Sequence, residues 1–223
     1  MIPLRDSTRS LSSPIVVYGI IAACVAIFLY TQSLGDAAVD RFYLTYGAIP
    51  AAVTSGAWQA AGIGLITSMF LHGSWLHLGG NMLYLWVFGD NVEDAMGHGR
   101  FVVFYLLTGV VAAMAHILVQ PLSGVPLVGA SGAIAGVLGA YLVLYPRARI
   151  QSLLILGWFW RVAELPALLV LGVWFLLEFA QATLSLGAGP VASIAFWAHV
   201  GGFAAGAVLI RLFIVGRSTA RVH

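Results

Sequence analysis

Charged residues are scarce in this 223-residue chain, and lysine is absent. Only 8% of the residues are charged, against roughly 25% in soluble domains, whereas 61% are hydrophobic. All ten positive charges are arginines, and the net charge is only +2, without a basic stripe for nucleic acid. This composition indicates a protein that crosses a membrane several times, and it argues against nucleic acid as a partner.

Cysteine is nearly absent as well. Cys24 is the only one, and it lies within an apolar run. A single cysteine excludes a disulfide framework and a metal site built from cysteines.

Six apolar stretches are candidate membrane spans, at about residues 14–33, 69–89, 101–120, 131–145, 163–183 and 193–214. The fourth is short, because fifteen helical residues span about 22 Å, less than the ~30 Å core of a bilayer. No repeat or low-complexity tract divides the chain. We therefore predict an all-α polytopic membrane protein, a six-transmembrane-helix bundle with a short fourth helix that forms a single domain over residues 1–223.

The arginines indicate how these spans are oriented. With six spans and a cytoplasmic N-terminus, only Arg41 lies outside, and the inner side holds the other nine, Arg5, Arg9, Arg100, Arg147, Arg149, Arg161, Arg211, Arg217 and Arg221. We expect residues 1–13 and the tail 215–223 to be cytoplasmic. The connection 34–62 is expected to lie in the outer interface.

One serine and one histidine are the most informative polar residues of this apolar background. Ser131 begins the fourth stretch, after Gly129 and Ala130, and His199 lies in the sixth, so both fall near the outer ends of their helices. Polar residues at membrane depth are functional candidates by default. Because a histidine can take the proton that makes a hydroxyl reactive, the pair predicts nucleophilic catalysis.

Small residues follow both side chains. Gly132 and Gly136 lie one helical turn apart after Ser131, and Gly202 and Gly206 have the same spacing after His199. Each stripe alone is a common packing motif of membrane helices. Together they predict two helices that approach closely enough for a hydrogen bond between the serine and the histidine.

A second polar cluster, His72, His77 and Asn81, lies at the outer end of the second stretch. His77 and Asn81 are four residues apart and share a helix face, so they and the Ser131 backbone N–H are candidates to stabilise an oxyanion. A metal site is the alternative, but His72 and His77 are five apart and no nearby carboxylate completes a ligand set. We therefore expect no metal and no cofactor.

These features resemble the rhomboid family of intramembrane serine proteases, of the bacterial type. The resemblance runs over nearly the whole chain and rests on four motifs, His77 with Asn81, Val92-Glu93-Asp94-Ala95-Met96-Gly97 before Arg100, Gly129-Ala130-Ser131-Gly132, and Ala198-His199-Val200-Gly201-Gly202. No one of them would suffice, but their combination is specific.

The resemblance implies an endopeptidase with a Ser131/His199 dyad and no third carboxylate, which cleaves a transmembrane protein substrate near the outer face. It also implies that His77, Asn81 and the Ser131 N–H form the oxyanion hole. The location it implies is a bacterial inner membrane. Because a helix must unwind before its carbonyl carbons can be attacked, we expect substrates with small or helix-destabilising residues near the cleavage site.

The resemblance also assigns supporting roles. Glu93 and Gly97 match a family motif at the inner end of the second span, where a structural role is implied. In the family the fifth span moves aside to admit substrate, which makes Trp174, Phe175 and Phe179 candidate gate residues.

Two departures from the family pattern stand out. An aromatic residue four positions after the serine stacks on the catalytic histidine in many rhomboids, whereas this chain has Ala135 there. The orientation of His199 must then come from another group. In the first loop, Trp58 precedes Gln59 rather than arginine.

Two other classes of protein are alternatives. A proton-coupled transporter would use Glu178, His116 and His199 as a relay, but the spans show no inverted repeat with paired broken helices. Glu178 is expected instead to be a hydrogen-bonded structural residue, and His116, near Pro121, an interfacial one. A non-catalytic rhomboid-like scaffold is the other alternative, although such a scaffold would lack the serine or the histidine.

Overall fold

The computed structural model describes residues 1–186 and 195–214, without the side chains of residues 58–61 and 156. The tail predicted at 215–223 lies outside the described residues. The elements, in chain order, are β1 (Ile2–Asp6), α1 (Ile15–Gln32), α2 (Asp36–Tyr46), α3 (Pro50–Thr54), α4 (Trp58–Thr67), the 3₁₀ turn η1 (Ser68–Phe70), α5 (Trp75–Met96), α6 (His98–Val119), α7 (Ser131–Leu144), β2 (Arg149–Leu156), β3 (Phe159–Pro166), α8 (Ala167–Ser185) and α9 (Phe196–Phe213).

Four of the described helices, α1, α6, α8 and α9, are long and apolar enough to cross a membrane. The helix α7 is apolar but shorter, as predicted for the fourth stretch. The helix α5 is long, but its last two turns hold Asp90, Glu93 and Asp94. The count of six spans, which needs α5 and α7 as well, stays a prediction.

The fold is mostly helical rather than all-α, because the strands form an antiparallel sheet in the order β1-β2-β3. The hairpin of β2 and β3 turns at Gly157 and Trp158, where Gly157 has a φ of +61°. A two-residue hairpin turn needs positive φ, and glycine adopts it without strain. No strand was predicted here: residues 146–162 lay between two expected spans, and residues 163–166 were placed in the next span.

Two predicted boundaries are also corrected. The stretch 69–89 corresponds to α5, which begins later because Ser74 caps it by accepting the His77 N–H at 3.1 Å. The stretch 163–183 was placed too early, since residues 163–166 belong to β3.

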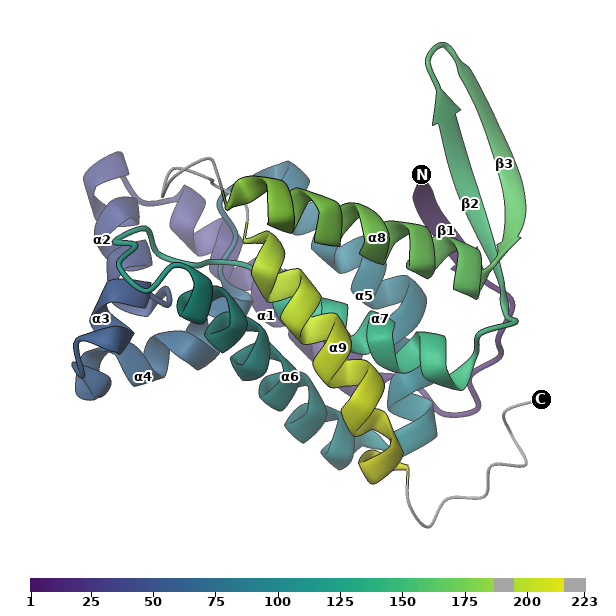
Figure 1. The fold of residues 1–223 in the computed structure, drawn as a ribbon, viewed down its shortest axis with the longest axis horizontal. Coiled ribbons are helices and arrows are strands. Elements are labelled where there is room, and N and C mark those ends of the chain that lie inside the picture. The colour runs from purple at the N-terminus through teal and green to yellow at the C-terminus, as the bar shows by residue number, and fades with distance from the viewer. Residues whose placement is uncertain (187–194, 215–223) are drawn as a thin grey trace.

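The two ends of the bundle differ in structure. Figure 1 shows α2, α3 and α4 at one end and the sheet at the other, beside the N-terminus. The connection 34–62, predicted as an interfacial loop, therefore holds α2, α3 and the first part of α4. Its chain pairs with the segment before α7, where Leu127 and Ala48 exchange N–H···O bonds of 2.8 and 3.1 Å.

A buried carboxylate connects α5 with the start of α1 at the sheet end. Glu93, whose side chain is fully buried, accepts the N–H groups of Val16 and Val17 at 3.0 and 2.9 Å and so caps the first turn of α1. Gly97, between α5 and α6, has a φ of +85°, which favours glycine. Both residues thus fix how α1, α5 and α6 meet.

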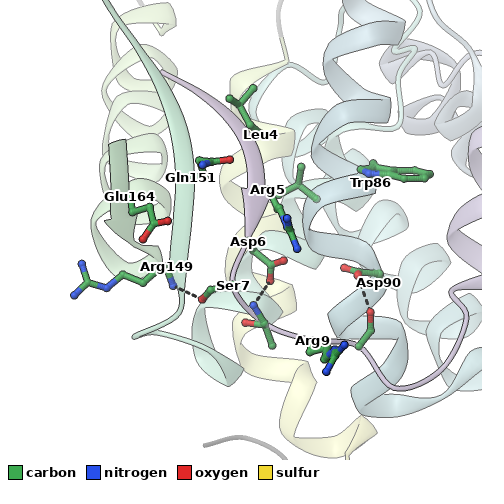
Figure 2. A pocket seen from close by; sticks show the side chains of 13 residues that line it. Leu4, Arg5, Asp6, Ser7, Arg9, Trp86, Asp90, Arg149, Gln151 and Glu164 are labelled. Atoms are coloured by element: carbon green, nitrogen blue, oxygen red, sulfur yellow. Dashed lines mark hydrogen bonds between the residues drawn. The ribbon is translucent and has the colours of Figure 1, made fainter. Parts of the chain in front are cut away.

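A polar cavity of about 810 Å³ lies at this end, between β1 and α5 (Figure 2). Its walls include Arg5, Asp6, Asp90 and Arg149, and the Ser10 hydroxyl donates to Asp90 at 2.8 Å. None of the residues predicted for chemistry lines it.

The helix α7 forms the centre of the bundle, and eleven of its fourteen residues are buried. It packs more extensively against α9 than any other two described elements pack together. The glycines make this contact possible, because a Cβ on Gly202 would overlap the carbonyl of Gly132, and one on Gly206 would overlap that of Gly136. The two predicted glycine stripes therefore face each other.

Replacing Gly206 by alanine is expected to destabilise the bundle, because the added Cβ meets the backbone of α7. Overpacking of a tight contact costs about 1–3 kcal/mol. Thermal unfolding of the purified protein in detergent measures the change. Gly172→Ala in α8 is the matched control, since nothing lies within 4 Å of its new Cβ. Equal unfolding midpoints for Gly206→Ala and the unmodified protein would contradict the contact between the two backbones.

Candidate active site

Ser131 is the first residue of α7 and follows a turn that requires glycine. Gly129 has a φ of +134°, and its N–H donates to the carbonyl of Ser68 at 2.9 Å. The first N–H groups of an α-helix have no acceptor within the helix, and they carry partial positive charge. The Ser131 hydroxyl and backbone N–H therefore lie together at a polarised helix end.

His199 lies in the first turn of α9, and its Nε2 is 2.8 Å from Ser131 Oγ. The serine hydroxyl donates to Nε2 when the ring carries its proton on Nδ1. The contact between Gly132 and Gly202, close after each residue, holds the two backbones at the distance this bond needs. The structure thus brings together the two residues that the sequence singled out.

A third side chain, Glu178 of α8, joins this pair. Its Oε2 lies 2.7 Å from His199 Nδ1, and the side chains of Glu178 and His199 are only 15% and 13% exposed. The structure differs here from the implied dyad, which had no carboxylate behind the histidine. A sequence signal did exist, because Glu178 is the only charged residue of α8, but the rotation of the helix decides which way it points.

The residues predicted for oxyanion stabilisation border the same space. A Cβ added to Gly129 would lie 2.7 Å from His77 Nε2 and 3.6 Å from Ser131 Oγ, so both side chains adjoin one small volume beside this glycine. Asn81, one turn after His77 on α5, lines a cavity that Ser131 and His77 also border. The residues of the three candidate donors, His77, Asn81 and Ser131, therefore line one cavity.

Asn81 is itself held in place by His72. The amide Nδ2 donates to His72 Nε2 at 3.0 Å, and the His72 and His77 rings are 5.2 Å apart. Because an amide nitrogen only donates, His72 Nε2 is the acceptor and carries no proton in this bond. The sequence placed His72 in the cluster but gave no hint that it orients the asparagine.

The site opens into a cavity of about 530 Å³. Ser131, His199, His77 and Asn81 line it, and further polar walls come from His116, Gln120 and Ser123. The connection between α6 and α7 supplies an apolar wall, from Val125 to Val128. His116 is buried near the end of α6 and lines this cavity. Its expected position at the membrane interface stays a prediction.

The three candidate gate residues extend along α8 toward α9. The Trp174 ring lies 6.2 Å from the His199 ring and 5.9 Å from Phe203, and Phe175 stacks on Phe203 at 4.6 Å. Phe179, which is 44% exposed, meets Trp197 at 6.3 Å. Moving α8 outward would separate these rings. The role of the three residues as a gate stays a prediction.

The described residues include no group of three or more histidine, cysteine or acidic side chains that could hold a metal ion. His72 and His77 are near each other, but Asn81 rather than a carboxylate completes their cluster. The polar side chains brought together at the site are those of Ser131, the histidines, Asn81 and Glu178.

The fold and the site define a multi-pass membrane protein with a serine, a histidine and a glutamate at one end of its helices. A family model described as Rhomboid domain matches residues 56–216, and this chain belongs to the rhomboid family. The match covers α4 to α9 and all the residues of the site.

Similar proteins come from several organisms. Rhomboid-like protein 11, chloroplastic, of Arabidopsis thaliana is 33% identical over 155 residues, which are 66% of this chain and 51% of that protein. The rhomboid protease GluP of Bacillus subtilis is 34% identical over 130 residues, 58% of this chain and 24% of that protein. Rhomboid protein 1, mitochondrial, of Saccharomyces cerevisiae is 36% identical over 92 residues, which are 40% of this chain and 27% of that protein. The chain spans about half or less of the length of these relatives.

Proposed function

We propose that this protein is an intramembrane serine endopeptidase that hydrolyses a peptide bond in or near the outer end of transmembrane substrate helices. The observation that carries the proposal is the 2.8 Å contact of Ser131 Oγ with His199 Nε2, at the wall of a cavity of about 530 Å³. A serine paired with a histidine base performs acyl transfer on several unrelated folds. Membership of a family that includes the protease GluP supports the same activity.

In the first half of the reaction, Ser131 Oγ attacks the carbonyl carbon of the scissile bond while His199 Nε2 takes the hydroxyl proton. The carbonyl oxygen becomes an oxyanion in a tetrahedral intermediate. The donors that stabilise it are the Ser131 N–H, the His77 ring and the Asn81 amide, whose residues all line the cavity.

In the second half, the intermediate collapses and the C–N bond breaks, as His199 gives its proton to the departing amine. The new N-terminal fragment remains esterified to Ser131. A water molecule, deprotonated by the same imidazole, then attacks this ester and restores the free hydroxyl. Gln120, Ser123 and His116 give the cavity a polar lining that can hold such water.

The proposed orientation follows from the ends of the molecule. With α1, α5, α6, α7, α8 and α9 as six spans, the serine end faces outward and the sheet end lies in the cytoplasm with both termini. Arg5 and Arg149, in the strands of the sheet, and Arg100, in the first turn of α6, then lie inside, in agreement with the positive-inside rule. The location we propose, a bacterial inner membrane, rests on the resemblance to rhomboid proteases of the bacterial type and not on the arginines.

The proposed substrates are transmembrane proteins whose helices unwind easily near the outer face. In an intact helix the backbone carbonyls are hydrogen-bonded and shielded by side chains, so the serine cannot reach a carbonyl carbon. Small or helix-destabilising residues lower the free energy of local unwinding, because glycine and proline weaken a helix by about 1 and 3 kcal/mol.

Ser131→Ala is expected to abolish cleavage of a single-span substrate by the purified protein in detergent, and His199→Ala to do the same. The serine variant removes only one oxygen, so the bundle should unfold at an unchanged temperature. Cleavage that persists in Ser131→Ala would overturn the serine assignment. Failure of the unmodified protein to cleave any of several substrates would favour the scaffold instead.

Asn81→Ala is expected to lower kcat by about 100- to 1000-fold, the usual effect of losing one oxyanion donor. Initial rates over a range of substrate concentrations measure it. Asn91→Ala is the matched control on the same helix, because Asn91 Nδ2 donates to Asp6 at the sheet end, 3.0 Å away and far from the serine. A rate for Asn81→Ala equal to that of the control would remove Asn81 from the oxyanion hole.

Chelators are expected to leave the initial rate unchanged, because the reaction as proposed uses no metal. The measurement compares cleavage before and after incubation with a strong divalent-metal chelator and removal of the complex by gel filtration. Loss of activity that returns on adding a metal ion would contradict the serine mechanism.

A further inference from the structure

We infer that Glu178 is a positioning residue for His199, so that the site works as a Ser131–His199–Glu178 triad rather than as a dyad; the inference rests on the proposed function. The carboxylate and the serine lie on opposite edges of one imidazole ring, at 2.7 Å from Nδ1 and 2.8 Å from Nε2. A proton on Nδ1 donated to Glu178 leaves the lone pair of Nε2 directed at the serine hydroxyl. This is the tautomer that a general base requires.

The surroundings of Glu178 argue against a simple packing role. It is the only charged residue of α8, a helix with a mean hydropathy of 1.8, and its side chain is 15% exposed. Burying a carboxylate is unfavourable unless it is hydrogen-bonded. No arginine pairs with it within residues 1–186 and 195–214, so the His199 N–H is the bond that offsets this cost.

The side chains that orient the His199 ring come from α8, because α7 places no aromatic residue beside it. Ala135 lies one turn after Ser131, is fully buried, and leaves no ring to stack on His199. Trp174 and Glu178, four residues apart on one face of α8, approach His199 instead, the indole at 6.2 Å with an interplanar angle of 36° and the carboxylate at the Nδ1 edge. Two residues of one helix thus contact His199: Trp174 packs against its ring, and Glu178 fixes which ring nitrogen carries the proton.

The carboxylate also acts during the reaction. When Nε2 takes the serine proton the ring becomes an imidazolium cation, and Glu178 lies in hydrogen-bond contact with it. The attraction is stronger for the cation than for the neutral ring, so it favours the transition state over the resting site. Glu178 neither touches substrate nor gains the proton.

Kinetics of Glu178→Gln test the inference. The amide has the same shape but can donate to Nδ1, which favours the wrong tautomer, so we expect kcat to fall by about 100- to 10,000-fold. KM should stay within about threefold, because substrate contacts are unchanged. Glu164→Gln, the same change at an exposed position of β3, is the matched control and should cleave like the unmodified protein. Glu178→Asp keeps the charge and should recover part of the lost kcat.

NMR of protein with isotope-labelled histidine gives a readout that does not depend on cleavage. The His199 ring nitrogens, assigned by comparison with His199→Ala, should report a proton on Nδ1 in the unmodified protein and on Nε2 in Glu178→Gln. A kcat for Glu178→Gln equal to that of Glu164→Gln, a change in KM alone, or an Nε2-protonated ring in the unmodified protein would each overturn the role of Glu178. If Ser131→Ala cleaves normally, the proposed function fails instead, and the NMR result still decides whether Glu178 holds the ring.

Discussion

The close approach of α7 and α9 is the constraint on which the rest of the structure depends. Gly132 faces Gly202 and Gly136 faces Gly206, and neither pair leaves room for even a methyl group. Lipid does not drive two apolar helices together as water does, so van der Waals contact between backbones has to provide the attraction. The serine and the histidine lie at one end of this contact, and they meet because the glycines that follow them in α7 and α9 meet.

Polar side chains of the site hydrogen-bond to one another. The serine, histidine and glutamate do so in one chain of contacts from α7 through α9 to α8, and Asn81 is satisfied by His72. The irregular backbone around the site, including the turn at Gly129, lines a cavity rather than facing lipid. The helix α8 supplies Glu178 and also carries the three gate candidates, whose role stays a prediction.

Much of the helical fold and of the candidate site could be predicted from the sequence. Apolar runs predicted the helices because burial in lipid or protein leaves a strong hydropathy signal, and the spacing of the glycines predicted which faces of α7 and α9 meet. The sheet was not predicted, since its pairing of the N-terminal strand β1 with β2 joins segments about 150 residues apart and leaves no local pattern. The bond between Glu178 and His199 could not be predicted either, because it depends on the rotation of α8 about its axis, which a nearly uniformly apolar helix does not reveal. His72 was visible in the sequence, but its bond to Asn81 depends on the turn before α5.

The central claim is that Ser131 is a nucleophile activated by His199. Its most direct test is covalent modification of the purified protein by a serine-reactive phosphonate, located by mass spectrometry of peptides. The account predicts a single adduct, on Ser131, that disappears in His199→Ala while that variant remains folded. Absence of an adduct on Ser131 in the unmodified protein, or labelling that survives the loss of His199, would contradict it.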